Sequence, residues 1–238
     1  MKYFVVPDIH GQNDKLTMLL NSINNLKSQD DCVIFLGDYI DRGHESFDVI
    51  KSIQAFEEQH DNTITLLGNH DVMFYNAVID ISNNINVEEH LKNLLSQSSE
   101  TLLSFGLDHP IIKSKNPFVV QQDVSDHMVS LFKKFKQSDE FCLFKHLILN
   151  SDYYIETNDF IFSHSGGVNY LKPEEQSPTQ WLWSRDFAKR RFSDKTFIVG
   201  HTPIDEDEPK QHGQILMCDT GSVFVNHRPL PLIILEES

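Results

Sequence analysis

The chain has 238 residues, of which 39% are hydrophobic and 23% are charged. This length suffices for one domain with a substantial apolar core, and the composition excludes a disordered chain, so we expect a single domain over residues 1–238. The formal net charge of -15 disfavours nucleic acids and anionic membranes as partners, because like charges repel.

Three apolar runs rich in β-branched residues open the chain, at residues 2–6, 32–36 and 63–67. Each run ends in a polar cluster: PDIHG, GDYIDRG and GNHD. Between the runs, residues 13–26 and 46–59 carry apolar side chains at helical spacing. This alternation of strand and helix predicts parallel strands, whose carboxyl ends gather the reactive groups of such sheets.

The rest of the chain divides into a helical part and a second strand-rich part. Residues 72–149 are polar and patchily helical, with Pro110 and Pro117 as breaks, and indicate a helical insertion. Strand signals resume in DYYIETNDFIFSHSG, where Asn158 and Asp159 predict a hairpin turn. They continue through TFIVGH, GQILMCD, SVFVN and LPLIILE, and we expect this second half to be more antiparallel.

Candidate metal ligands stand at the ends of the predicted strands. Asp8 and His10 are expected on the same side of a strand end, because alternate residues of an extended segment face the same way. In isolation such a pair is more often a capping aspartate beside a surface histidine, and a lone strand-end histidine is more often structural. Together the clusters favour a metal site, and they supply Asp8, His10, Asp38, Asp41, Asn69, His70, His164 and His201.

This mixture of donor atoms suits a pair of divalent cations. Carboxylate and amide oxygens satisfy hard ions, while manganese, iron and zinc also accept imidazole nitrogen. The two oxygens of Asp38 allow that side chain to bridge two ions, as two-metal hydrolysis requires. Gly37, Gly43 and Gly68 fit tight turns between strand and site. The predicted activity is therefore the hydrolysis of a phosphoester.

In their order, the motifs DIHG, GDYIDRG, GNHD, HSG and GH resemble those of the phosphoprotein phosphatase family within the calcineurin-like metallophosphoesterases. They extend from Asp8 to His201, and the predicted insertion carries no match. The resemblance implies an α/β (α+β) fold: a β-sandwich flanked by helices, with a helical insertion. Periodicity alone does not distinguish this two-sheet sandwich from a doubly wound sheet.

The resemblance also implies how the metal ions are held and what they do. The cofactor is expected to be two Mn²⁺ ions, and iron, zinc or nickel would also suit the ligands. A hydroxide between the ions would attack phosphorus directly, without a phosphoenzyme. The implied ligands are Asp8 and His10 for the first ion, Asp38 as the bridge, and Asn69, His164 and His201 for the second.

By the same resemblance, His70 is the general acid that protonates the leaving oxygen, and Asp41 orients its ring. Arg42 would bind the substrate phosphoryl group, because a planar guanidinium matches two phosphate oxygens. Asn69 is expected to contact the phosphoryl group as well as an ion.

A second phosphate-binding arginine is expected near the segment WLWSRD. Arg185 resembles it, although Arg190 and Arg191 lie close by and a surface salt bridge is the alternative. The aromatic group around Trp181 and Trp183 is more often core packing, but its place near Arg185 leaves a substrate platform open.

The expected substrate rests on departures from the family pattern. Asp71 stands where many protein phosphatases have glutamate, and Leu67 where eukaryotic ones have arginine, so a bacterial- or phage-type enzyme is favoured. Asp71 also resembles the symmetrically cutting dinucleoside polyphosphate hydrolases, which usually lack the aspartate corresponding to Asp41.

The leading hypothesis is therefore a serine/threonine phosphoprotein phosphatase acting on a phosphorylated protein or peptide. The alternative is a symmetrical bis(5'-nucleosyl)-tetraphosphatase acting on a nucleotide. A catalytically silent phosphate-binding module is disfavoured, because every catalytic position is filled.

The cysteines and the apolar runs predict where the protein resides. Cys32, Cys142 and Cys218 are odd in number and widely spaced, which fits neither a disulfide framework nor a thiolate zinc site. The N-terminal apolar run stops at Pro7, too short for a signal peptide, and no later stretch would span a bilayer. We expect a soluble, cytoplasmic protein.

Overall fold

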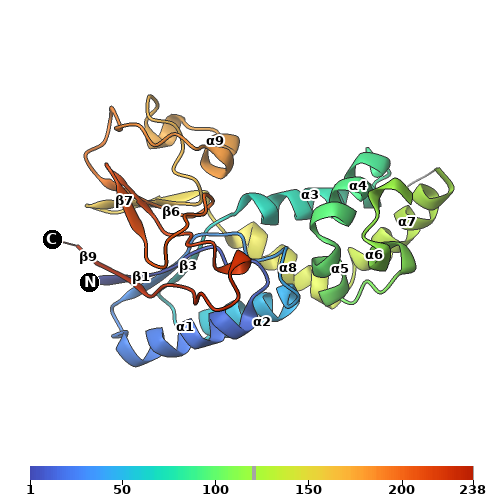
Figure 1. Ribbon diagram of the computed structural model, residues 1–238, viewed down its shortest axis with the longest axis horizontal. Coiled ribbons are helices and arrows are strands. Elements are labelled where there is room, and N and C mark those ends of the chain that lie inside the picture. Colours follow the sequence, from blue (N-terminus) through green and yellow to red (C-terminus); the bar gives the residue numbers. More distant parts are fainter. Residues whose placement is uncertain (120–121, 238) are drawn as a thin grey trace.

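Two β-sheets face each other, with helices on their outer sides and a group of helices extending from one end (Figure 1). The computed structural model describes residues 1–119 and 122–237. The expected insertion includes residues 120–121 and the expected domain includes residue 238, and these three lie outside the described residues. The two-sheet sandwich with flanking helices that the resemblance implied is confirmed.

The first sheet has the strand order β3-β2-β1-β9. As predicted, β1, β2 and β3 pair in parallel, and the intervening segments are helices on one face of the sheet. β9 pairs antiparallel with β1, so the first and last strands of the chain lie side by side (Figure 1). The elements concerned are β1 (Lys2–Val6), α1 (Asn13–Leu26), β2 (Cys32–Phe35), α2 (Ser46–Glu57), β3 (Thr63–Thr65) and β9 (Ile233–Glu236).

The second sheet has the strand order β4-β5-β6-β8-β7. The expectation of a more antiparallel second half is wrong for the centre of this sheet, where β5, β6 and β8 pair in parallel, and holds for its edge strands β4 and β7, which pair antiparallel. The long connection from β5 to β6, which contains η2 and α9, leaves room for a crossover. The elements are β4 (Tyr154–Glu156), β5 (Phe160–Ser163), η2 (Pro173–Glu175), α9 (Pro178–Trp183), β6 (Thr196–Val199), β7 (Lys210–His212) and β8 (Ile215–Met217).

Two local turns decide the edges of this sheet. The hairpin expected at Asn158 and Asp159 is confirmed: it joins β4 to β5. The strand expected at SVFVN is absent, and the 3-10 helix η3 (Ser222–Phe224) stands there. Gly221, at a φ of 66°, turns the chain into this helix, four residues after the end of β8. Strand β7 was not predicted, because its residues are exposed and polar.

Alternation along the strands divides the core into layers. Phe4 and Val6 of β1 pack towards the helices, whereas Tyr3 and Val5 pack between the two sheets. On the outer face of the second sheet, the buried Trp181 of α9 packs with residues of β5, β6 and β8. The sandwich therefore brings the carboxyl ends of strands from both sheets to one edge.

The segment between β3 and β4 is helical, as predicted. Its core is rich in phenylalanine: the rings of Phe74 and Phe105 lie 5.5 and 5.8 Å from that of Phe144. This core is continuous with the one between the first sheet and its helices. The helices are α3 (Asn69–Ser82), α4 (Val87–Gln97), α5 (Ser99–Ser104), α6 (Pro110–Ser114), η1 (Pro117–Val119), α7 (Gln122–Phe135) and α8 (Asp139–Asn150).

Helix α3 begins at Asn69, three residues before the expected start of the insertion at residue 72. Two predicted site residues, Asn69 and His70, therefore occupy the first turn of a helix, which holds them more rigidly than a loop would.

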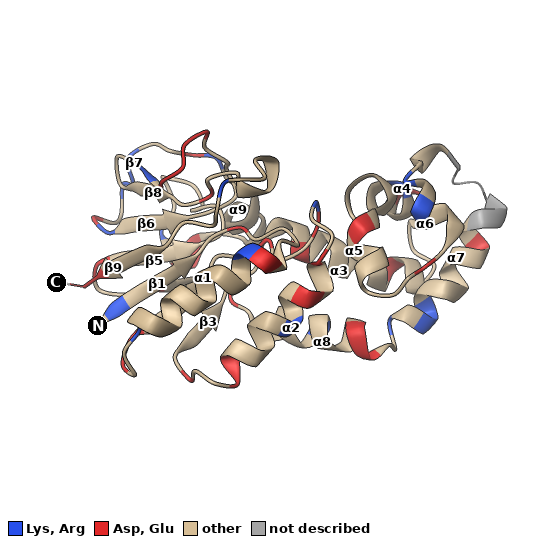
Figure 2. Cartoon of the chain, turned by 60° about the horizontal axis from the view of Figure 1, so that its bottom comes forward, with Lys and Arg blue, Asp and Glu red and all other residues tan. Residues whose placement is uncertain are grey.

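Acidic residues occur on helices and loops of both the sandwich and the helical segment (Figure 2). Within residues 1–119 and 122–237, none of the helices combines the length and the hydrophobicity needed to cross a bilayer.

Candidate metal and phosphate site

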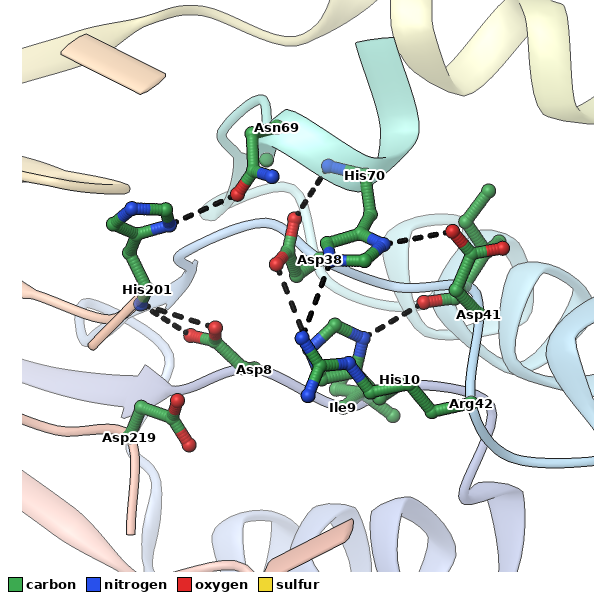
Figure 3. A network of polar contacts seen from close by, with 12 residues as sticks. Asp8, Ile9, His10, Asp38, Asp41, Arg42, Asn69, His70, His201 and Asp219 are labelled. Atoms are coloured by element: carbon green, nitrogen blue, oxygen red, sulfur yellow. Dashed lines mark hydrogen bonds and ion pairs between the residues drawn. The ribbon is translucent and has the colours of Figure 1, made fainter. Parts of the chain in front are cut away.

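Strand ends from both sheets meet at one site (Figure 3). Asp8 and His10 follow β1, Asp38 follows β2, and Asn69 and His70 open the helix after β3. From the second sheet, the histidines that follow β5 and β6 complete the group. The structure brings together all the predicted ligands, namely Asp8, His10, Asp38, Asn69, His164 and His201.

Asp38 lies at the centre of the site. Its Oδ2 is 3.5 Å from His10 Nε2, and its Oδ1 is 3.5 Å from His164 Nε2. Two groups of side chains have ligand atoms within 4.8 Å of one another: Asp8, Asp38 and His164 form one, and His10, Asp38 and His70 form the other. Because both groups include Asp38, a single carboxylate stands between two places where a cation could bind.

The amide of Asn69 and the carboxylate of Asp8 complete the part of the site that faces the second sheet. Asn69 Oδ1 lies 2.9 Å from His164 Nε2 and 2.9 Å from His201 Nδ1. Both carboxylate oxygens of Asp8 accept the backbone N–H of His201, at 3.0 and 3.1 Å. One amide oxygen and two imidazole nitrogens thus converge on one place, as ligands of a common ion would.

The histidines have their lone pairs available for a metal. His10 Nδ1 lies 2.9 Å from the Ile40 carbonyl oxygen, and His164 Nδ1 lies 2.9 Å from that of Leu36. A carbonyl can only accept, so the proton sits on Nδ1 and Nε2 faces Asp38 unprotonated. Burial lowers the pKa of His10 and, together with the neighbouring His164, that of His201, in each case to about 3. These neutral imidazoles are in the form that binds metals.

The buried carboxylates need positive charge nearby. Burial and the negative charges of Asp219 and Asp38 hold the pKa of Asp8 well above its usual value. Burial alone would also raise the pKa of Asp38, but the positive charge that His164, His70 and His10 carry when protonated, together with the His70 backbone N–H that donates to Oδ1 at 3.0 Å, lowers it below its usual range. Clustered, desolvated carboxylates are costly unless cations compensate them. The nitrogen and oxygen donors present fit divalent cations, so the site suits a metal centre.

Asp219 belongs to this site and was missed in the sequence. It directly follows Cys218 at the end of β8, so the pattern of a carboxylate after an apolar strand could have identified it. Burial, with Asp38 adding to it, raises the pKa of Asp219 to about 6. Its Oδ1 accepts the Gly221 N–H at 2.8 Å, and the side chain lies on the Asp8 side of the site (Figure 3).

Several site residues have left-handed backbone conformations that cost free energy outside glycine. Asp71 supports this region: its carboxylate accepts the N–H groups of Asp38 at 2.8 Å, Tyr39 at 3.0 Å and Gly68 at 3.1 Å. In the sequence, Asp71 only helped to choose between classes of substrate. In the structure, it fixes the loop that carries Asp38, whose carboxylate lies at the centre of the site. Positive φ values occur at His10, Asp38, Asp41, Arg42 and His201.

Two glycines are required because backbone and carboxylate approach closely. A Cβ on Gly68 would lie 2.0 Å from the backbone nitrogen of Asp38 and 2.2 Å from its Oδ1. A Cβ on Gly200 would lie 2.0 Å from Asp8 Oδ1. Gly37, at a φ of 93°, makes the tight turn expected of it before Asp38.

Replacing Gly68 with alanine should push Asp38 out of place. We expect a loss of about 1–3 kcal/mol in the free energy of unfolding, from overpacking, and weaker metal binding. Urea unfolding and metal titration by calorimetry would measure both effects. Gly213→Ala is the control for backbone strain alone: its methyl meets open space and the φ of 59° there costs some stability, but metal affinity should stay unchanged. Unchanged metal affinity in Gly68→Ala would contradict the close approach.

His70 and Asp41 form a pair on the other side of Asp38. His70 Nδ1 lies 2.7 Å from Asp41 Oδ2 (Figure 3). Burial by itself lowers the pKa of His70, but the hydrogen bond that His70 donates to Asp41 and the charge of Asp38 outweigh it, so the pKa is raised. Arg42 Nη2 lies 3.4 Å from His70 Nε2, and the exposed guanidinium lies 4.7 Å from the centre of the Phe224 ring. The His70–Asp41 pair can hold a proton at His70 Nε2. This atom lies next to the Arg42 guanidinium, a cation suited to binding phosphate.

A cavity of about 380 Å³ opens beside His70 and Arg42. Its walls come from Phe224 and from the helical segment, including Leu95 and Glu100. The helical segment therefore reaches the site and forms one wall of this cavity.

The two arginines Arg185 and Arg190, in and after the segment WLWSRD, differ in their exposure to solvent. Arg185 is exposed, and its charge contributes to lowering the pKa of His201, after burial and His164. Arg190 is buried and donates to the carbonyl oxygens of Gly167 at 3.3 Å and Asp186 at 3.0 Å, so it is a structural residue.

The two tryptophans also differ. Trp181 is core, stacked on Tyr154 with ring centres 4.5 Å apart. Trp183 is exposed, with its ring centre 5.9 Å from that of His201, so the platform interpretation applies to Trp183 alone.

Comparison with known proteins agrees with this geometry. A family model described as calcineurin-like phosphoesterase matches residues 1–224. The asymmetrical bis(5'-nucleosyl)-tetraphosphatase PrpE of Anoxybacillus flavithermus is 24% identical over 233 residues, which cover 94% of this chain and 87% of that protein. The serine/threonine-protein phosphatase SIT4 of Candida albicans is 39% identical over 70 residues, 28% of this chain and 22% of that protein. The cold-active protein-tyrosine phosphatase of a Shewanella species shares the fold, with a TM-score of 0.59 at 16% identity over 99% of this chain and 75% of that one.

Proposed function

Because the chain belongs to the calcineurin-like phosphoesterase family, we propose that it hydrolyses phosphomonoesters at a pair of divalent metal ions. The observation that carries this proposal is the convergence of two possible ligand groups on Asp38. When bound, two such ions would activate water and draw charge from the phosphoryl oxygens. We propose manganese first, with iron, zinc or nickel as alternatives. The proposed ligands are Asp8 and His10 for one ion, Asp38 for both, and Asn69, His164 and His201 for the other.

We assign the transfer of a proton to His70. Asp41 holds Nδ1, so Nε2 is the atom that faces the substrate side, next to Arg42. The raised pKa keeps more of the imidazole protonated near neutral pH, which suits a general acid. The leaving oxygen would take the proton from Nε2 as its bond to phosphorus breaks.

Arg42 is proposed to bind the phosphoryl group, with Asn69 and Arg185 as further contacts. Arg42→Ala should lower kcat/KM by about 10²-fold, because hydrogen bonds to charged groups contribute roughly 1.5–3 kcal/mol each. Arg42→Lys keeps the charge but loses the planar fork, so it should recover part of the loss. Initial rates over a range of substrate concentrations would measure this. Equal kcat/KM in Arg42→Ala and the wild type would contradict the assignment.

For the substrate, we propose phosphoserine and phosphothreonine in proteins or peptides. An alkoxide is a poor leaving group and needs a proton, whereas a nucleotide leaves with its negative charge on phosphate oxygens. The pairing of Asp41 with His70 therefore supports a phosphoester whose leaving oxygen must be protonated.

A nucleotide substrate is the second candidate, because of the comparisons. The similarity to the tetraphosphatase PrpE runs over nearly the whole chain, whereas that to SIT4 covers 28% of it. The cavity of about 380 Å³ beside His70 has the volume of a small-molecule site, and the exposed Phe224 could stack with a base.

The test is a hydrolysis screen of the manganese-loaded protein. We expect phosphate release from phosphoserine and phosphothreonine peptides. Diadenosine tetraphosphate is the competing substrate, and its products separate the two modes of cleavage: two ADP from symmetrical cleavage, AMP and ATP from asymmetrical cleavage. Cleavage of this compound with no release from any peptide would replace the first proposal by the second. Failure with every phosphoester would remove both.

A further inference from the structure

We propose that Thr101, on helix α5 of the helical segment, is a positioning residue for His70 and acts through Asp41. This inference rests on the proposed function, since it concerns the proton transfer of the same site. It gives the part of the helical segment that follows the GNHD motif a role in the reaction, although that part carries none of the recognised motifs.

The hydroxyl of Thr101 makes two hydrogen bonds to Asp41. The side chain is completely buried. Its Oγ1 accepts the Asp41 N–H at 2.9 Å and donates to Asp41 Oδ1 at 2.8 Å. Because its one proton goes to Asp41, Ser46 must be the donor in the 3.1 Å contact between the two hydroxyls. Thr101 therefore fixes both the backbone and the side chain of Asp41.

The two carboxylate oxygens of Asp41 have different hydrogen-bonding partners. Oδ1 accepts from Thr101, and Oδ2 lies 2.7 Å from His70 Nδ1. With one oxygen held, the carboxylate cannot rotate without breaking a buried hydrogen bond. The direction in which His70 presents Nε2 is thereby set by a residue 60 positions from Asp41 in the sequence.

This loop needs external support because its backbone is strained. Asp41 and Arg42 both have a φ of 71°, a left-handed conformation that side chains rarely adopt. Helix α5 also contacts the end of this loop and the start of α2: His44 Nδ1 lies 2.7 Å from Glu100 Oε2, and the Phe47 N–H donates to Ser104 Oγ at 3.2 Å. The acid and the proposed phosphate-binding arginine are thus held against the helical segment.

The expected loss of activity depends on whether the leaving group must be protonated. Thr101→Val has the same shape but leaves Asp41 Oδ1 and the Asp41 N–H without partners. Loss of an outer hydrogen-bonding partner typically costs about 10–100-fold. That loss should appear with phosphoserine peptide, whose alkoxide must be protonated. With p-nitrophenyl phosphate, whose leaving group is stable as an anion, we expect a change of less than about threefold.

The experiment compares kcat and KM of the manganese-loaded wild type, Thr101→Val and Thr101→Ser on both substrates. Thr101→Ser keeps the hydroxyl and should restore most of the kcat lost with phosphoserine peptide. KM should change little, because Thr101 does not reach the substrate. Thr17→Val is the matched control: its exposed hydroxyl donates to the Asn13 carbonyl oxygen within α1, and both rates should stay at the wild-type level.

Two outcomes would overturn the inference separately from the proposed function. If Thr101→Val lost activity equally on both substrates and serine did not restore it, Thr101 would be a structural residue only. If Thr101→Val retained wild-type kcat with phosphoserine peptide, Thr101 would have no part in the acid step. Failure of the wild type on both substrates would instead reject the proposed function, and this role with it.

Discussion

Replacing Asp38 with asparagine should abolish both metal binding and hydrolysis. Its carboxylate belongs to both possible ligand groups, and the neighbouring imidazoles hold its pKa low, so it carries a negative charge. Asparagine fills the same space without that charge and with one oxygen. Metal chemistry contributes several kcal/mol to the transition state, so we expect a fall in kcat/KM of at least about 10³-fold. Metal content after dialysis and the rate on p-nitrophenyl phosphate would measure the two effects.

A matched control separates this effect from a general change of charge. Asp48→Asn removes one carboxylate from the exposed face of α2, where Asp48 pairs with Lys51 at 2.6 Å. Such surface pairs contribute roughly 0–1 kcal/mol, so metal content and rate should stay unchanged. If Asp38→Asn retained two ions per chain, Asp38 would not be needed as the bridge, and this assignment would have to be abandoned.

Replacing His70 with asparagine should reduce kcat with a phosphoserine peptide by about 10²- to 10⁴-fold, the usual contribution of a positioned general acid. The metal content should remain that of the wild type. This second measurement is needed because His70 also lies within ligand distance of His10 and Asp38. Loss of an ion from the variant would make His70 a ligand and would leave the acid unassigned.

The pairing with Asp41 supplies a stricter test of the same assignment. If the two residues act as one unit, Asp41→Asn combined with His70→Asn should be no slower than His70→Asn alone. Fully additive losses would show that Asp41 acts independently of His70. His146→Asn, on the exposed side of α8, is the control for the loss of an imidazole.

The strand-end residues of the site could be read from the sequence because their placement follows from local rules. In the first sheet, each apolar run is a parallel strand, and side chains alternate along it, so Asp8, Asp38 and Asn69 had to collect at one edge. The fold of this half followed from the same alternation of strands and helices.

The orientation of the second sheet could not be read in this way. Strands β5, β6 and β8 have the same apolar character whether they pair in parallel or antiparallel, and the choice depends on the connections between them. The segment SVFVN has strand propensity, yet Gly221 turns it away and the chain lies on α1, where Lys15 Nζ donates to the Ser222 carbonyl oxygen at 2.7 Å.

By itself, the sequence determined the kinds of donor atom, their order along the chain and the family. The tertiary structure alone decided which groups support them: Asp71 beneath Asp38, Asp219 beside Asp8, and Thr101 behind Asp41. The reason is physical. A ligand at a strand end is specified by its neighbours in the chain, whereas a supporting hydrogen bond joins residues tens of positions apart and exists only after the helices have packed.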